Sequence, residues 1–516
     1  MNDNKKFEFL IDGHLKELVE HTQNMATARN YASLATAYNV RGMFIQALEA
    51  AEKATELEAE HFTGWFEYSI AATTTDEKHL RKILERLNEL NTAGKGDSSE
   101  IKTAMALTHY YLAEDKRAMN IAHEVLEENG GVTHTFEVLG YIAYNSNDVK
   151  AAIRHFLKAL EVDDSNFRAH WMTGHCWFEL DDLSAAKASY QRAVELQPYF
   201  ANAWFSLGKI YLVQEEIQRA YQCFNKCLSI NPRMWDCYFT QADYYLGHRK
   251  HDHAISCCQR ILELDPDVAI RAEALNYIGE VYLASRNFDV AQYYFEQAIS
   301  VDNTDAVPFN NLGVTLMKQE HVDEAIELFK KAHELDSTFA YPITKLGQAF
   351  LFKRQLEDAM EMFKKALDTD PEEYWAWLGI SEIHRKNRQY RKELEAIMKA
   401  AEICSDDSDV YNYMGIAFQS LRDYDSAEKA YTRSLELDPL NRKAANNLGF
   451  LYERFYEKSK DEKYREKAVA AWKQRLLICR DTAASTKGAI THLIKLGVEE
   501  KTITMWLNEE QLIQGE

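Results

Sequence analysis

Residues 201–211 read Ala-Asn-Ala-Trp-Phe-Ser-Leu-Gly-Lys-Ile-Tyr, and this stretch decides the fold. Four of its residues are spaced three, one and three apart, which puts them on one face of an α-helix: Trp204, Leu207, Gly208 and Tyr211. A second stripe with helical spacing begins nine residues later and ends at a proline, which closes a helix: Ala220, Phe224, Cys227 and Pro232. The segment therefore predicts two amphipathic helices joined by a short turn.

The same pattern returns every 34 residues, with one insertion of three residues. Matching positions hold Tyr238, Ala242, Tyr245, Ala254, Cys258 and Pro266; Gly279, Tyr282, Ala291, Phe295 and Ala298; Leu312, Gly313, Ala325, Phe329 and Ala332; and Leu346, Gly347, Phe350, Ala359, Phe363, Ala366 and Pro371. Repeats that begin near residues 133, 167, 374, 408 and 442 keep the same phase. Small residues at positions 8 and 20 let the two helices approach, and aromatic residues at positions 4, 11 and 24 fill the space between them. Because one pair cannot cover its own apolar face, neighbouring pairs must stack.

This pattern resembles the tetratricopeptide repeat (TPR) family over roughly residues 28–478. The resemblance implies an all-α solenoid of about thirteen repeats, wound as a right-handed superhelix of antiparallel helix pairs. It also implies that the first helix of each pair lines a concave groove, and that the protein is a scaffold, an adaptor or a co-chaperone. We expect more than about 70% helix, because paired helices and short turns leave room for little else.

The repeats divide the chain into segments of different regularity. We expect a capping helix over 1–27, three repeats over 28–131 (the second and third degenerate), nine repeats over 132–441, a basic TPR-like repeat with an insertion over 442–480, and capping helices over 481–516. The most loop-like stretch is 91–99, where we expect a local break or bend.

Composition limits the partners and the compartment. The chain has 516 residues, of which 46% are hydrophobic, and a net charge of −21. An acidic surface repels nucleic-acid phosphates and anionic lipids, so neither is an expected partner. We find no secretory leader and no apolar run long enough to span a membrane. Eight cysteines without a disulfide framework favour a reducing, cytoplasmic location.

No stretch of sequence carries a recognisable catalytic motif. There is no Gly-rich phosphate loop, no His-Glu-x-x-His and no nucleophile elbow, so we expect neither an enzyme nor a cofactor. Five cysteines between Cys223 and Cys258 could present thiolates to zinc or act in redox regulation, but small buried packing residues explain them as well: Cys223, Cys227, Cys237, Cys257 and Cys258. Three histidines could form a metal or pH-sensing patch or a solvated turn: His248, His251 and His253.

Within the TPR resemblance, positions 2, 5, 9 and 12 of the first helix face the groove, and the position 5 column has two characters. The aromatic part contains Trp171, Phe205 and Phe239, and the carboxamide part contains Asn276, Asn310, Asn412 and Asn446. Exposed aromatic rings suit a covering partner, although neighbouring helices could bury them instead. The asparagines resemble the column that grips peptide backbone in O-GlcNAc transferase repeats, interrupted here at Thr344 and Leu378; they could also be polar filler.

Charge is not uniform along the chain. Residues 442–480 hold eleven basic and five acidic residues, a balance of +6. The candidates for a basic contact surface are Lys443, Arg454, Lys458, Lys463 and Arg465. A solvated helical face is the alternative.

These observations predict a non-catalytic scaffold, adaptor or chaperone-like holder that binds peptide or helical segments of other proteins in the groove. The carboxylate clamp of some TPR co-chaperones is not expected, because Lys209 is the one residue of that set present. The alternatives are a metal- or redox-dependent regulator that uses the cysteine cluster, and a self-assembling solenoid. The sequence leaves the oligomeric state open.

Overall fold

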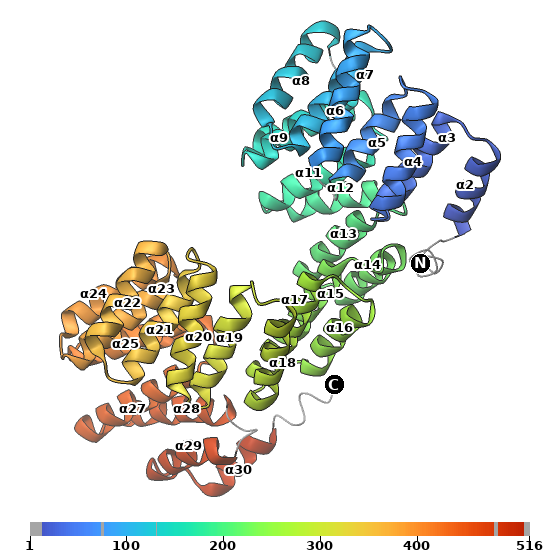
Figure 1. Ribbon diagram of the computed structural model, residues 1–516. Helices are drawn as coiled ribbons and strands as arrows, with labels where there is room; N and C mark the ends of the chain where they lie inside the picture. The colour runs from blue at the N-terminus through green and yellow to red at the C-terminus, as the bar shows by residue number, and fades with distance from the viewer. Residues whose placement is uncertain (1–12, 74–76, 131, 479–482, 510–516) are drawn as a thin grey trace. The chain divides into compact units, whose positions relative to one another are not determined.

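The computed structural model describes residues 13–73, 77–130, 132–478 and 483–509, which form 29 α-helices and no strand. The chain divides into two compact units, Met1–His248 and Arg249–Glu516. The expectation of a mainly helical chain is confirmed, since 81% of it is helical. In each unit the helices lie side by side in pairs (Figure 1).

The helices of the first unit are α2 (Gly13–Asn24), α3 (Ala28–Asn39), α4 (Phe44–Leu57), α5 (Phe62–Ala72), α6 (Glu77–Thr92), α7 (Ser98–Tyr111), α8 (Asp115–Asn129), α9 (Thr133–Asn145), α10 (Val149–Val162), α11 (Phe167–Glu179), α12 (Leu183–Leu196), α13 (Ala201–Val213), α14 (Ile217–Ile230) and α15 (Trp235–Gly247).

The helices of the second unit are α16 (His251–Glu263), α17 (Val268–Ala284), α18 (Phe288–Val301), α19 (Ala306–Lys318), α20 (Val322–Leu335), α21 (Ala340–Phe352), α22 (Leu356–Thr369), α23 (Tyr374–Lys386), α24 (Tyr390–Ile403), α25 (Ser408–Ser420), α26 (Tyr424–Leu437), α27 (Arg442–Ser459), α28 (Glu462–Ile478), α29 (Ala483–Lys495) and α30 (Glu500–Glu509).

Most repeats from residue 133 onward are held together by a glycine that faces an aromatic ring. A methyl group built on Gly313 of α19 would lie 2.6 Å from Cε1 of Phe329 on α20, and Gly208 has the same relation to Phe224. The alanine at position 20 is fully buried in successive repeats, as at Ala325. These contacts give the sequence repeat its physical meaning, because only a small residue lets the ring fill the space between the helices.

The turn inside most repeats contains a residue with left-handed backbone geometry. Arg354, between α21 and α22, has a φ of 61°, and Arg388 and Arg422 repeat it at the same 34-residue spacing. This turn ends the first helix sharply and starts the second without a glycine. It also fixes where the Arg354 side chain leaves the backbone.

The first unit differs from a simple stack because its first repeat contacts the end of its fifth repeat and the start of its sixth. The N–H of Ala201 donates to the carbonyl of Val40 (3.2 Å), and the Arg41 guanidinium lies 4.2 Å from the centroid of the Tyr199 ring. The repeat pattern describes contacts between neighbours only, so it does not predict this closure. Between the two contacting repeats, in the stretch predicted to break or bend, the turn after α6 contains Gly94 and Gly96, both with positive φ.

Both ends of the repeat array carry additional helices. Leu15 of α2 is fully buried in a core cluster with residues of α3, and Leu493 and Ile503 of α29 and α30 are buried in a cluster with Trp472. Residues 1–12 and 510–516 of the predicted capping segments lie outside the described residues. Whether these helices protect the ends from aggregation remains a prediction.

Candidate partner-binding surface

Two hollows lie along the first helices of successive repeats in the second unit. The first, of about 460 Å³, is lined by residues of α19, α21, α23 and α25, and the second, of about 480 Å³, by residues of α25, α27 and α28. Tyr413 of α25 lines both. We call the two hollows together the Tyr413 strip.

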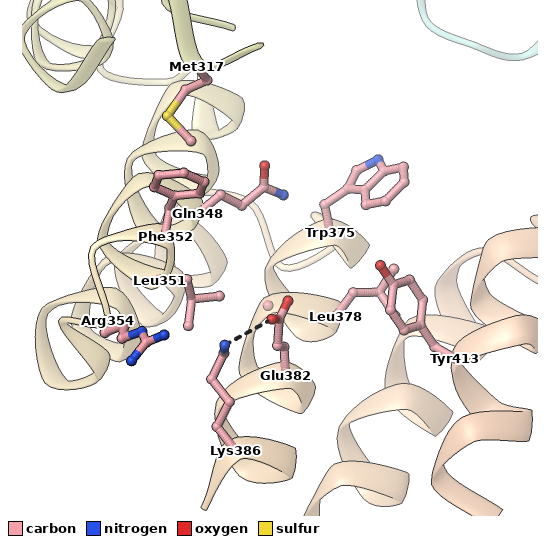
Figure 2. Close-up of a pocket in the computed structure, with 11 residues that line it drawn as sticks. Met317, Gln348, Leu351, Phe352, Arg354, Trp375, Leu378, Glu382, Lys386 and Tyr413 are labelled. Carbon is pink, nitrogen blue, oxygen red and sulfur yellow. Dashed lines mark ion pairs between the residues drawn. The ribbon is translucent and has the colours of Figure 1, made fainter. Parts of the chain in front are cut away.

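The first hollow combines apolar walls with an ion pair. Figure 2 shows Leu351 and Phe352 on one side and Trp375 and Leu378 on the other. Phe352 is 58% exposed, which is unusual for so large an apolar side chain. The floor also holds Glu382, whose Oε1 is 3.5 Å from Nζ of Lys386 and 3.7 Å from Nη2 of Arg385. Arg354 leaves its left-handed turn beside Leu351 (Figure 2).

The second hollow is polar and basic. It is lined by Asn412, Tyr413, Ile416, Arg442, Lys443, Asn446, Asn447 and Arg475. The Nδ2 of Asn447 donates to Oδ1 of Asn412 (2.9 Å), which fixes the Asn447 amide, and Nζ of Lys443 lies 3.2 Å from Oδ2 of Asp409. Among the described residues, none is found to pair with the amide of Asn446. That amide can donate to and accept from a peptide backbone.

Lys345 of α21 stands beside the first hollow in an aromatic setting. Its Nζ donates to Oε1 of Gln348 (3.3 Å) and lies 4.3 Å from the centroid of the Tyr341 ring and 5.8 Å from that of Trp375. Burial lowers the pKa of Lys345 to about 8, and the carboxylate of Glu373 acts in the opposite direction. A negative charge brought near this amine would stabilise its protonated form.

The seven predicted groove residues are divided between the two units. Trp171, Phe205 and Phe239 lie in the first unit, whereas the four asparagines lie in the second. The structure buries three of these asparagines: Asn276, Asn310 and Asn412. Asn446 is half-buried and lines the Tyr413 strip.

The buried asparagines are used inside the protein. The Nδ2 of Asn311 donates to Oδ1 of Asn276 (3.1 Å), and the Nδ2 of Asn447 donates to Oδ1 of Asn412 in the same way. In both pairs the donor lies 35 residues after the acceptor, which is one residue more than the repeat length. Asn276 also donates to Oε1 of Glu280 (2.9 Å). At these two places a position 5 asparagine pairs with a position 6 asparagine of the next repeat, and the position 6 residue is the more exposed of the two.

The aromatic candidates in the first unit are half-buried. Nε1 of Trp171 donates to Oγ of Ser206 (3.1 Å), and its ring packs edge-on against Phe200 (5.2 Å between centroids). Trp171 also lines a cavity of about 350 Å³ whose opposite wall includes Val40 of the first repeat. Phe205 packs against Phe224. A role of these rings in binding a partner remains a prediction.

The five basic candidates have different local contacts, and a shared contact surface remains a prediction. Lys443 lies in the Tyr413 strip, whereas Arg454 and Lys458 lie over the ring of Tyr424, at 5.0 and 5.9 Å from its centroid. Nε of Arg465 donates to the carbonyl of Leu496 (2.6 Å) and so ties α28 to the end of α29. Lys463 is exposed at the start of α28.

The cysteine cluster is distributed over both units. Burial raises the pKa of Cys223 and of Cys257 to about 11, which disfavours the thiolate that zinc requires. Cys227 and Cys258 are fully buried, and Cys237 is buried in the same core cluster as Cys223. The ring of His248 contacts Tyr244 (4.1 Å between centroids). In the part of the chain that the structure describes, no group of three or more His, Cys, Asp or Glu side chains could hold a metal ion.

Sequence comparison agrees with the helix-pair architecture. Models of the tetratricopeptide repeat match residues 138–199, 201–234, 239–311, 306–339, 344–408 and 408–441. The chain belongs to the tetratricopeptide repeat family. This TPR protein has no match among the curated proteins. Within the described ranges, none of its helices combines the length and the apolar composition needed to cross a bilayer.

Among solved structures, this TPR chain is similar to one in the crystal structure of the APC/C hetero-tetramer Cut9-Hcn1. The two share 14% sequence identity with a TM-score of 0.40, over 90% of this chain and 96% of that chain. A likeness of this degree says nothing about partners. Membership of this family makes the protein an interaction scaffold. The TPR scaffold fold typically has no catalytic activity.

Several residues of the Tyr413 strip were not among the sequence candidates. Trp375 and Glu382 occupy positions 2 and 9 of their repeat, which the TPR resemblance also assigns to the groove, so those columns could have identified them. Tyr413 occupies position 6. Arg475 lies on the second helix of its pair, where no groove column points to it.

Proposed function

We propose that this protein is a non-catalytic adaptor or chaperone-like holder that binds segments of partner proteins along the Tyr413 strip. The observation that carries the proposal is the continuity of the strip. Two hollows from successive repeats meet at Tyr413 and present apolar, carboxamide and charged side chains in order. A single extended or helical segment can contact several of them at once.

Exposed apolar area supports this assignment of the site. Phe352 is 58% exposed, and the half-buried rings of Trp375 and Tyr413 line the same hollow from the other side, which gives a partner several large apolar side chains to contact. In the first unit, by contrast, the cavity beside Trp171 is walled by the protein's own first repeat. The Tyr413 strip is therefore the better candidate for an outside partner.

We also propose that the protein acts in the cytoplasm, as its sequence predicts. The seven cysteines that the structure describes are free, which suits a reducing compartment.

The test is quantitative affinity capture from the source cells with wild-type protein and with the double substitution Trp375→Ala and Tyr413→Ala. We expect at least a tenfold loss of captured partner, since aromatic anchors often contribute about 2 kcal/mol each. Tyr293→Ala, at a 55% exposed site on the second-helix side of its repeat, is the matched control and should capture as wild type does. Thermal unfolding must show both variants folded. Equal capture by a folded double variant would refute the proposal.

A further inference from the structure

The closed arrangement of the first unit surrounds a cavity of about 350 Å³. Its lining residues come from the first helices of six successive repeats, which are α3, α5, α7, α9, α11 and α13. Val40 and Phe200, which lie on opposite sides of the contact that closes the unit, both line the cavity. The closure therefore creates the cavity, and its volume is that of a site for a small ligand.

Aromatic rings form much of the cavity wall. The ring of Tyr110 stacks on that of Tyr141, with 5.7 Å between centroids, and the ring of Trp171 packs edge-on against Phe200. Tyr111 also lines the cavity, with its ring centroid 5.2 Å from that of Tyr110. Aromatic faces and edges of this kind favour contact with another aromatic ring.

The described residues give the wall no uncompensated charge. The one ionic residue among those that line the cavity is Arg168, and its Nη2 donates hydrogen bonds to the buried carboxylate of Glu67. Burial raises the pKa of Tyr111 and of Tyr141, so both hydroxyls stay neutral. A charged ligand would lose its hydration here without gaining a counter-charge, so the wall selects an uncharged ligand.

One polar atom of the wall lacks a partner. The Nδ2 of Asn39, which lines the cavity, donates to Oε2 and to the carbonyl oxygen of Glu67, at 2.7 and 3.0 Å, and this fixes the orientation of the amide. The Oδ1 of Asn39 is buried and accepts no hydrogen bond from the described residues. A donor that reaches this oxygen from the cavity would satisfy it, and buried acceptors are costly when they are left unpaired.

We propose that this cavity, the Asn39 pocket, binds a small uncharged aromatic molecule that carries a hydrogen-bond donor, such as a phenol or an indole. The ring of the ligand lies among Tyr110, Tyr141 and Trp171, and its O–H or N–H group donates to Oδ1 of Asn39. The pocket shares no residue with the Tyr413 strip, so this binding is a second function beyond the binding of partner proteins.

Two other occupants are compatible with an unpaired acceptor. A water molecule could donate to Oδ1 of Asn39, but a single water fills little of a cavity of about 350 Å³ and leaves the aromatic rings without contacts. A Tyr or Trp side chain of a partner protein has the same chemistry as the free ligand. The first repeat walls the cavity at Val40 and Phe44, which favours a free molecule over a ring attached to a chain.

Occupation of the Asn39 pocket is coupled to the closure of the first unit. Because the wall includes Val40 from one side of the closure and Phe200 from the other, a ligand that contacts both stabilises the closed form. Bound ligand should therefore increase the protection of backbone amides in α3 and α13 against hydrogen exchange.

The experiment uses the full chain and four ring compounds of similar size: p-cresol, toluene, benzoate and benzylamine. Isothermal titration calorimetry at neutral pH should show p-cresol binding at least about tenfold more tightly than toluene, because toluene has no donor for Asn39. Benzoate and benzylamine, which are charged at neutral pH, should also bind at least about tenfold more weakly than p-cresol. Hydrogen exchange with and without p-cresol measures the coupling to closure.

Variants locate the binding. Asn202→Trp enlarges a half-buried side chain of the wall and should weaken p-cresol at least about tenfold. Asn225→Trp makes the same substitution at an exposed position on α14 and should leave binding unchanged. Asn39→Ala should bind p-cresol no more tightly than toluene, since the acceptor is gone. Thermal unfolding checks that each variant is folded, and if Asn39→Ala is not, the two Trp variants decide the location.

Three results would overturn the inference. The first is equal binding of p-cresol and toluene to the wild-type protein, or p-cresol binding that Asn202→Trp leaves unchanged. The second is the absence of binding by all four compounds, which would show that the cavity holds water alone. The third is tighter binding of N-acetyl-tyrosinamide than of p-cresol, which would assign the pocket to a side chain of a partner protein.

Discussion

The guanidinium of Arg168 donates hydrogen bonds from Nη2 to both carboxylate oxygens of Glu67, at 2.7 and 2.9 Å, although 101 residues separate the two in the chain. Nδ2 of Asn39 donates to the same carboxylate (2.7 Å). Glu67 is almost completely buried, and Arg168 is largely so. This network joins α3, α5 and α11 and fastens the closed arrangement of the first unit.

Removing Arg168 should therefore open the first unit. Arg168→Met leaves the Glu67 carboxylate buried without its cation, which costs roughly 3–5 kcal/mol. Hydrogen exchange should show loss of protection in α3 and α13. Arg192→Met, which removes an exposed pair with Glu195, should cost less than about 1 kcal/mol and leave exchange unchanged. Equal exchange in the two variants would mean that the Arg168 pair does not hold the closure.

The glycine–aromatic contact predicts a second stability effect. Gly313→Ala places a methyl group 2.6 Å from Cε1 of Phe329, so the ring or the helix must shift, at a cost of about 1–3 kcal/mol. Gly488→Ala in α29 meets no atom within 4 Å and should stabilise by about 0.5–1 kcal/mol because alanine favours helix. Urea unfolding measures both. Destabilisation of similar size in both variants would contradict the assigned role of the glycine.

Two neighbouring residues test the C-terminal helices as a cap. Leu493 is fully buried against the last repeat, whereas Ile494 is 44% exposed. Leu493→Asp should expose the apolar cluster around Trp472 and cause aggregation, and Ile494→Asp should remain soluble. Deletion of 481–516 should resemble Leu493→Asp. Light scattering during heating provides the measurement, and a soluble, equally stable deletion would show that this segment is a free tail.

Glu393 makes stability depend on pH. It stands at position 20 of its repeat, where alanine is usual. Burial raises the pKa of Glu393 to about 7, and the positive charge of Arg385, whose Nε lies 4.0 Å from Oε1, acts to lower that pKa. The folded chain holds this proton more tightly than the unfolded chain, so stability falls as pH rises from about 4.5 to about 7.

Glu393→Gln keeps the side chain neutral and should remove that loss. The variant's free energy of unfolding should exceed that of wild type by near zero at pH 4.5 and by at most roughly 3 kcal/mol at pH 8, because one unit of pKa corresponds to 1.36 kcal/mol. Urea unfolding at the two pH values measures it, and exposed Glu395→Gln is the control. A gain that is the same at both pH values would refute the assignment.

The architecture of each repeat was predictable because its contacts are local. Gly313 and Phe329 lie 16 residues apart, and the same spacing returns at Gly208 and Phe224 and at Gly347 and Phe363, so the spacing alone identifies a helix pair and its packing. The pairing of Arg168 with Glu67 occurs once, across 101 residues, and leaves no periodic signal. The closure of the first unit was for that reason not predictable from repeats.

The candidate site was predicted only in part. Position 5 was assigned to the groove from family resemblance, yet Asn412 at that position is buried because Asn447 of the next repeat hydrogen-bonds to it. The strip draws on position 5 at Leu378, Asn412 and Asn446, and it also draws on positions 2, 6 and 9, at residues such as Trp375 and Tyr413. Which column reaches the surface depends on how consecutive first helices rotate against each other, and the sequence of one repeat does not contain that angle.

The most direct test of the central claim is site-specific photo-crosslinking in the source cells. A benzoyl-phenylalanine replaces Phe352 in the Tyr413 strip, and in a second protein it replaces Met398, which is 49% exposed on α24 outside the strip. We predict a discrete protein adduct from position 352, and at least about tenfold less from position 398. Equal adducts from both positions, or adducts from position 398 alone, would contradict a partner-binding Tyr413 strip.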